Sequence, residues 1–262
     1  MIIVVNHLTR MREGHICVAG VDLKTDQHVR PVLKWEQLTS QFLARNNGPF
    51  DLANVVDLGV TEPHPKKPHI EDRIFRPSQT RLLETLEAED FWALLYSISK
   101  PSLQAIFGSD LRRVGRASCG TDVGKGEASL GCLRPSRRPQ LKYTTRGRQG
   151  KPRIRIHLTD DRFDVWVGVT DIRLYENDHI TPDRAIVEQT AQRLQKSGAV
   201  ILGVGLTRPF SSSTEHENEP LHWLQVNNIH LEADPVRQRG PGESSRKSCG
   251  TKRRWWPFQS FN

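Results

Sequence analysis

A run of alternating residues near the middle of the chain carries the side chains best suited to bind a polyanion. Arg153, Arg155 and His157 alternate with apolar residues. Because successive side chains of a β-strand point to opposite faces, these three share one face of a predicted strand. Two guanidinium groups and an imidazole on one face can contact several phosphates of a nucleic-acid backbone.

A second alternating set offers groups that recognise bases. Trp223, Gln225 and Asn227 would share one face of a strand, and Trp166 would add another aromatic platform. Indole rings stack on bases, while side-chain amides hydrogen-bond to base edges. The alternative is that both tryptophans belong to the core, because tryptophan is highly buried on average.

Two further arginines occupy matching local positions. Arg30 and Arg208 each precede a proline at the end of an apolar run. Either guanidinium group suits contact with a phosphate or a base, and it equally suits a structural ion pair with a nearby carboxylate. The sequence leaves both interpretations open.

The pattern of acids, histidines and cysteines favours binding over catalysis. Asp160, Asp161, Asp164 and Asp171 form an acidic cluster of the kind that holds Mg²⁺ in a nuclease, although turn residues beside a basic strand are the preferred interpretation. The four cysteines and ten histidines show no C-x2-C or H-x3-H spacing. We therefore predict no catalytic residues, no metal site and no cofactor. Free thiols indicate a reducing compartment such as the cytoplasm.

Charge is concentrated in two segments. The chain of 262 residues has a formal net charge of +8, yet 1–110 carries net −2 and 158–235 carries net −7. Residues 111–157 carry net +11, and 236–262 carry net +6. A localised positive field of this kind attracts nucleic acid, while the same segments would also suit an acidic protein partner.

The basic end of the sequence combines Lys252, Arg253 and Arg254 with Trp255 and Trp256. Cations beside aromatic rings suit single-stranded nucleic acid or an anionic membrane surface, and a solvated tail without function is the alternative. We expect 236–262 to be disordered. No apolar run is long enough to span a membrane.

Short apolar runs bounded by turn residues predict a mainly β protein with a few helices. Strands are expected at 2–6, 16–21, 29–32 and 55–60, then at 153–158, 163–169, 199–206 and 223–231. Pro31 places its strand at an edge or ends it early. Helices are expected within 79–107 and at 182–197, the latter with Thr181 as N-cap.

These elements predict two small barrels or sandwiches joined by a helical and loop segment. We expect an N-terminal β domain with a helical extension at 1–110, a basic Gly/Arg-rich connector at 111–152 and a C-terminal β domain at 153–235. No close internal repeat is visible in the sequence.

Several motifs, in this order, resemble the dual OB-containing domain family of bacterial proteins. They are Ile2–Asn6, Cys17–Leu23, His28–Val32, Ser129–Pro135, Val169–Leu174, Val204–Phe210 and His222–Leu231. His28 departs from the aromatic residue expected before Val29. The resemblance implies two OB-type barrels that bind nucleic acid, with a role as accessory or sensor in an anti-invader system, and it supplies no catalytic residues.

We therefore expect a non-catalytic protein that binds single-stranded DNA or RNA. Its predicted contact residues are Arg153, Arg155, His157, Trp223, Gln225, Asn227, Arg30 and Arg208. A metal-dependent nuclease that uses the acids at 160–171, or a protein-interaction subunit, is the alternative.

Overall fold

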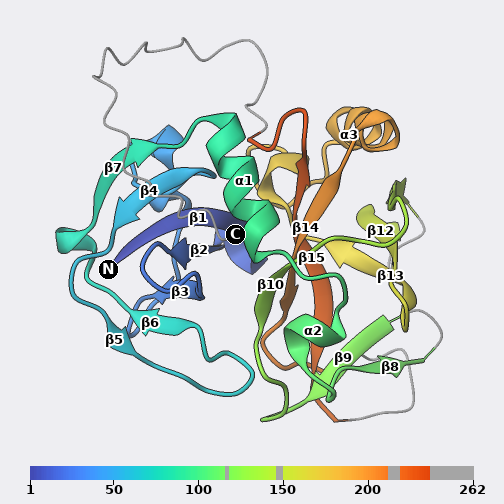
Figure 1. The fold of residues 1–262 in the computed structure, drawn as a ribbon, viewed down its shortest axis with the longest axis horizontal. Coiled ribbons are helices and arrows are strands. Elements are labelled where there is room, and N and C mark those ends of the chain that lie inside the picture. The colour runs from blue at the N-terminus through green and yellow to red at the C-terminus, as the bar shows by residue number, and fades with distance from the viewer. Residues whose placement is uncertain (116–117, 146–149, 212–218, 237–262) are drawn as a thin grey trace, which may run out of the picture.

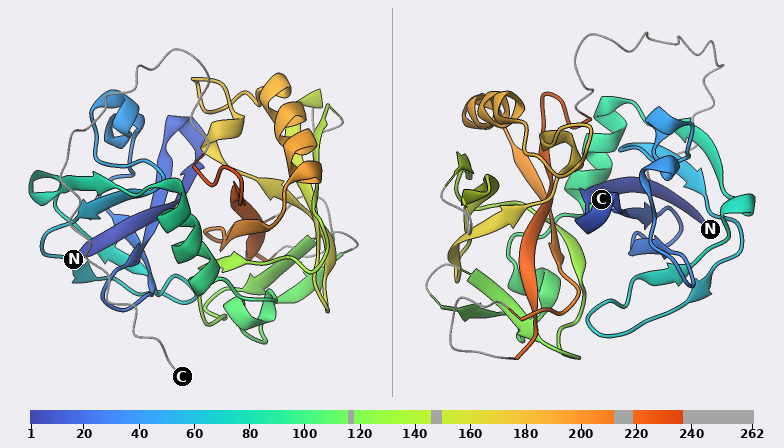
Figure 2. Two further views of the ribbon diagram at one scale, coloured as in Figure 1. Left: turned by 45° about the horizontal axis from the view of Figure 1, so that its top comes forward. Right: turned by 180° about the vertical axis from the view of Figure 1, so that it is seen from behind.

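The computed structural model describes residues 1–115, 118–145, 150–211 and 219–236, which form two β-rich halves side by side (Figures 1 and 2). The first half is built on a seven-stranded sheet in the order β5-β6-β3-β2-β1-β4-β7. Its strands are β1 (Ile2–Arg10), β2 (Ile16–Asp22), β3 (His28–Val32), β4 (Asn54–Asp57), β5 (Glu62–Pro63), β6 (Asp72–Ile74) and β7 (Arg81–Thr85).

The second half is built on an eight-stranded sheet, in which β10-β14-β15-β13-β12-β11 form a continuous path. Its strands are β8 (Arg112–Val114), β9 (Ser118–Asp122), β10 (Leu130–Leu133), β11 (Gln140–Thr144), β12 (Arg153–Thr159), β13 (Asp164–Val169), β14 (Val200–Leu206) and β15 (Leu221–Leu231). The α-helices are α1 (Ala88–Ile98), α2 (Gln104–Phe107) and α3 (Arg184–Lys196). No helix in the described ranges combines the length and the hydrophobicity of a membrane span.

Strand pairing in the second half follows the plan of an OB barrel. Strands β11, β12 and β13 form an antiparallel meander, α3 follows β13, and β14 and β15 pair antiparallel. β15 then lies parallel to β13. The path begins with β10 and ends with β11, which are joined by 134–139, so one interrupted strand brings the two ends of the sheet together. This arrangement curls the sheet into a barrel.

The first half repeats these relations. β1, β2 and β3 form a meander, β4 pairs with the other side of β1, and β6 lies parallel to β3. The protein is therefore mainly β and contains two OB-like barrels, as predicted. The correspondence is one of topology, because the sequence shows no close repeat.

The barrels meet along a polar contact between β1 and β15. The side chain of Asn228 forms two hydrogen bonds with the backbone of Leu8. Its Oδ1 accepts from the Leu8 amide at 2.8 Å, and its Nδ2 donates to the Leu8 carbonyl at 3.2 Å. Arg10 donates its backbone amide to the carbonyl of Thr170. Helix α1 covers this junction, and its Phe91 and Leu95 are fully buried in an apolar cluster shared by both halves. The second half therefore holds the first in a fixed orientation.

Several predicted elements differ from the structure. The predicted helix at 79–107 begins only at Ala88, because 81–85 form β7, which pairs with β4 and leaves Leu82 and Leu83 about half exposed. The helical spacing of these leucines is overridden by pairing along a sheet edge.

The connector expected at 111–152 also differs. It contributes β8 to β11 to the second sheet, and Leu111, Cys119, Leu133 and Leu141 lie in the second core. Short apolar positions among the arginines and glycines are enough to form these strands. The four residues 146–149 lie outside the described residues, as does the predicted disordered tail at 236–262 except for Val236, which packs half-buried against the first core.

Two smaller predictions are corrected by local geometry. The N-cap of α3 is Asp183, whose side chain accepts from the amide of Ile186, and not Thr181. Pro31 does not lie on an edge strand, because β3 pairs with β2 and β6. Its registered pairs with β2 nevertheless end at Val29, before the proline that has no amide to donate.

Candidate nucleic-acid interface

The outer face of β12 carries the predicted basic side chains. The strand alternates as expected, with Ile154, Ile156 and Leu158 buried, while Arg153 is exposed and Arg155 is half-buried. The apolar side chains fill the second core, so the polar ones are forced outward. This confirms the sequence prediction of two faces for the strand.

Trp166 on β13 lies directly opposite His157. The two rings stack with centroids 5.0 Å apart and planes inclined by 24°, and the Lys142 ammonium lies 4.8 Å from the indole centroid. Trp166 is half-buried on the outer face and does not belong to the core. The tryptophan thus forms an aromatic surface with cationic neighbours, as in proteins that bind single-stranded nucleic acid.

The outer face continues toward β15 across Gly168, a position that has no side chain. Gly168 pairs with Arg155 on one side and with Gln225 on the other, so all three share the outer face. A Cβ added to Gly168 would meet no atom within 4 Å. The backbone at Gly168 is therefore open to a ligand between a guanidinium group and a side-chain amide.

The side chain of Arg155 is held in place by a hydrogen bond to the neighbouring strand β13. Its guanidinium group donates to the carbonyl oxygen of Trp166. Burial, with a smaller contribution from the charge of Arg153, lowers the pKa of Arg155. An anion placed beside both arginines would relieve this repulsion.

Two other predicted contact residues on β15, Trp223 and Asn227, already have hydrogen-bond partners within the protein. Trp223 is half-buried where β15 pairs with β9, and its indole Nε1 donates to the carbonyl of Phe210 at 2.9 Å. Asn227 is buried by the first barrel and bonds to Gln225 and His7. Trp223 thus lies two residues from Gln225 on the same face of β15 with its indole N–H engaged, while the buried side chain of Asn227 is closed to a ligand.

Arg30 and Arg208 share one carboxylate between the barrels. Asp72 accepts from Arg30 Nε at 2.6 Å and from Arg208 Nη2 at 2.6 Å. The side chain of Arg30 is only 7% exposed and that of Arg208 is 50% exposed. The structural ion pair that the sequence left open is thus the arrangement found for both arginines.

Three of the four acids at 160–171, namely Asp160, Asp164 and Asp171, bond to the backbone or to neighbouring side chains. Asp160 accepts from the amides of Leu103, Arg162 and Phe163, while Asp171 is buried and forms an ion pair with Arg173. Within the described ranges, these acids form no group of three that could hold a metal ion.

Sequence reasoning missed two parts of the face. Lys142 is exposed on β11, and the alternation of Gln140, Leu141 and Lys142 was a usable signal within a segment interpreted as a connector. Nothing in the sequence marked Gly168 as part of the face, because its role depends on the side chains of the two strands that flank it, β12 and β15.

Sequence reasoning also missed a buried group of two histidines and a cysteine between the barrels. His7, His28 and Cys132 lie close together there. Their positions are far apart in the chain, and no spacing rule links them.

A barrel with this strand order, a helix after its third strand and a basic aromatic face on its second and third strands is an OB-type fold, of the class that binds oligonucleotides. Comparison with known families agrees with this class. The sequence matches the family described as "Dual OB-containing domain" over residues 1–229. The chain belongs to the dual OB-containing domain family. No curated protein and no solved structure matches it.

Proposed function

We propose that the protein binds single-stranded nucleic acid on the outer face of β12 and β13. The observation that carries the proposal is the convergence of Arg153, Arg155, His157 and Trp166 on that face. OB barrels use the face of their second and third strands for oligonucleotides, and β12 and β13 hold these positions here.

Each group has a distinct part in this proposal. Arg153 and Lys142 contact phosphates, since both are exposed, and the half-buried Arg155 contacts another phosphate beside Gly168. Trp166 stacks on a base, either directly or with His157 extending the stack. Gln225 hydrogen-bonds to a base edge that enters beside Gly168. Stacking with phosphate contacts tolerates many sequences, so we expect weak sequence preference.

The proposed role is binding without cleavage, as in an accessory or sensor protein of a bacterial anti-invader system. Asp160 and Asp171 are engaged in hydrogen bonds and an ion pair that hold loops in place. A cleavage assay with Mg²⁺ or Mn²⁺ tests this part, and product formation by the purified protein would restore the nuclease alternative.

Fluorescence anisotropy with labelled single-stranded DNA and RNA, measured over a salt series, tests binding. Each phosphate contact on a single strand adds about 0.7 to the slope of log K against log salt. Arg153→Ala with Arg155→Ala should lower this slope by about 1.4, so the loss of affinity between 50 and 200 mM salt should shrink about sevenfold.

The double variant Lys24→Ala with Arg76→Ala is the matched control, because both side chains are exposed on the other barrel. It removes two positive charges without touching β12. An equal effect of both changes would show a response to net charge alone. An unchanged affinity and slope in the double variant would place the binding site elsewhere. Co-purification with one protein, without nucleic-acid binding, would favour the protein-interaction alternative.

A further inference from the structure

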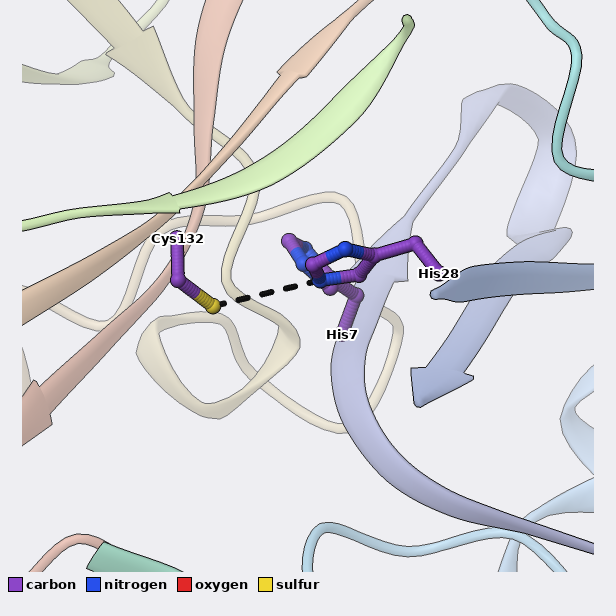
Figure 3. Close-up of side chains that lie close together, drawn as sticks. All are labelled: His7, His28 and Cys132. Atoms are coloured by element: carbon purple, nitrogen blue, oxygen red, sulfur yellow. Dashed lines mark hydrogen bonds between the residues drawn. The ribbon is translucent and has the colours of Figure 1, made fainter. Parts of the chain in front are cut away.

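Two histidines of the first barrel and a cysteine of the second meet at the junction (Figure 3). His7 lies on β1, His28 at the start of β3 and Cys132 on β10. One ring nitrogen of each histidine and the Sγ of Cys132 lie within 4.8 Å of one another. Imidazole nitrogen and thiolate sulfur are the ligands that zinc and similar transition-metal ions prefer.

The separations are close to those of a coordinated ion. His28 Nε2 and Cys132 Sγ are 4.0 Å apart. In a tetrahedral zinc site, bond lengths of about 2.3 Å to sulfur and 2.05 Å to nitrogen put these atoms about 3.6 Å apart. Small side-chain rotations would therefore bring both atoms to bonding distance.

A neighbouring amide orients the first histidine. His7 Nδ1 lies 3.2 Å from Asn227 Nδ2. The oxygen and nitrogen of an amide are interchangeable by a flip, so Asn227 accepts from Nδ1–H when it flips together with Gln225, whose amide now donates to Asn227 Oδ1. That tautomer leaves a lone pair on His7 Nε2, as is usual for a histidine ligand held by an outer hydrogen bond.

His7 Nε2 has no hydrogen-bond partner within the described part of the protein. His7 is 1% exposed, and its Nε2 is buried with no hydrogen-bond partner. A buried polar atom without a partner costs free energy that a ligand would recover. Gly203 leaves room for the ring, since a Cβ there would lie 3.1 Å from His7 Cε1 and Nδ1.

Asn6 lies beside the ligand atoms of His28 and Cys132. Its Nδ2 lies 3.1 Å from His28 Nε2 and 3.4 Å from Cys132 Sγ, while its Oδ1 is buried without a partner. The amide nitrogen thus donates to the same lone pairs that would bind a cation. After an amide flip, Oδ1 would face them as an oxygen ligand.

We propose that His7, His28 and Cys132 bind one thiolate-preferring transition-metal ion of the Zn²⁺ class, with Asn6 or a water as the fourth ligand. On binding, the Cys132 thiol loses its proton to solvent as the sulfur–metal bond forms. His28 is only half-buried and gives the ion a route inward. Because ligands come from both barrels, the ion fixes their orientation.

Cobalt substitution of the full-length protein tests the site. Co²⁺ bound by nitrogen and thiolate sulfur gives visible d–d bands and a near-ultraviolet charge-transfer band. We expect one Co²⁺ per chain, with bands that one equivalent of Zn²⁺ removes. Cys132→Ser should abolish the charge-transfer band, and His28→Gln should weaken binding at least tenfold by equilibrium dialysis.

Cys17→Ser is the matched control, because Cys17 is a free, half-buried thiol on β2 outside the group. It should keep the bands unchanged. A charge-transfer band that survives in Cys132→Ser, or binding of less than one Co²⁺ per chain by the wild-type protein, would overturn the proposal. If Cys132→Ser does not fold, His28→Gln decides the outcome, since loss of metal in that variant supports the site and retention opposes it.

Discussion

The shared carboxylate of Asp72 provides the sharpest test of how the barrels are held together. Asp72 is 3% exposed and binds Arg30 through Oδ1 and Arg208 through Oδ2, each at 2.6 Å. Arg30 also contacts His69 Nδ1 at 2.8 Å and donates to Ser129 Oγ at 3.2 Å. Asp72→Asn keeps the shape of the side chain and removes its charge, which leaves the Arg30 guanidinium buried without its direct counter-ion.

The two arginines should respond very differently. Removing one partner of a buried ion pair costs about 3–5 kcal/mol of unfolding free energy, so Asp72→Asn should fall in this range. Arg208→Gln should cost at most about 1 kcal/mol, because half of that side chain is in solvent and Asp72 keeps its bond to Arg30. The predicted ratio is at least threefold.

Urea unfolding with linear extrapolation measures both values. Glu188→Gln is the control, since it breaks the exposed pair with Arg184 on α3 and should cost about 0.3–0.5 kcal/mol. A cost of Asp72→Asn below 1 kcal/mol, or no greater than that of Arg208→Gln, would refute the view that this buried charge group stabilises the junction.

Three further predictions concern a histidine, a tryptophan and a helix cap. Burial, followed by the charges of Arg30 and Arg208 and by the neighbouring His222 ring, lowers the pKa of His69 to about 2. The folded protein therefore holds this ring neutral, while the unfolded ring takes up a proton below its ordinary pKa of about 6.5. Unfolding free energy should fall as pH decreases below 6.5, and His69→Asn should flatten that fall by up to about 1.4 kcal/mol per pH unit in urea titrations. Trp166→Ala should weaken binding of single-stranded nucleic acid by about 1–3 kcal/mol in anisotropy assays. The same change at Trp35, which is 85% exposed on the other barrel, should leave the affinity unaltered. Asp183→Ala removes the bond to the amide of Ile186 and should lower stability by about 1 kcal/mol, and a change below 0.3 kcal/mol would contradict the capping assignment.

Local patterns in the sequence determined much of the second barrel. The alternation around Arg155 correctly divided β12 into an apolar and a polar face, because side-chain direction in a strand depends only on position. The Asp160 turn was equally local, since its side chain bonds the amides that follow it. The ordered motifs also identified the family, now matched over 1–229.

Tertiary structure decided which of the predicted side chains meet. Arg30 and Arg208 occupy similar sequence contexts, yet both converge on Asp72, which only the packing of the two barrels makes possible. Asn227 follows the same alternation as Gln225 but is buried, because the first barrel covers that end of β15. Strand periodicity gives the face of a residue and carries no information about what covers the face.

Residues that are far apart in the sequence show most clearly that local patterns do not predict which side chains meet. His7, His28 and Cys132 come from three strands and two barrels, and their spacing in the sequence resembles no metal motif. Likewise, 81–85 carry leucines at helical spacing and form a strand, because β4 offers an edge with which to pair. The sequence alone determined the main strands β1–β4 and β12–β15, the two faces of β12 and the family, since these follow from local patterns. Pairing across the barrels and the contacts at their junction depend on long-range packing, which only the folded chain defines.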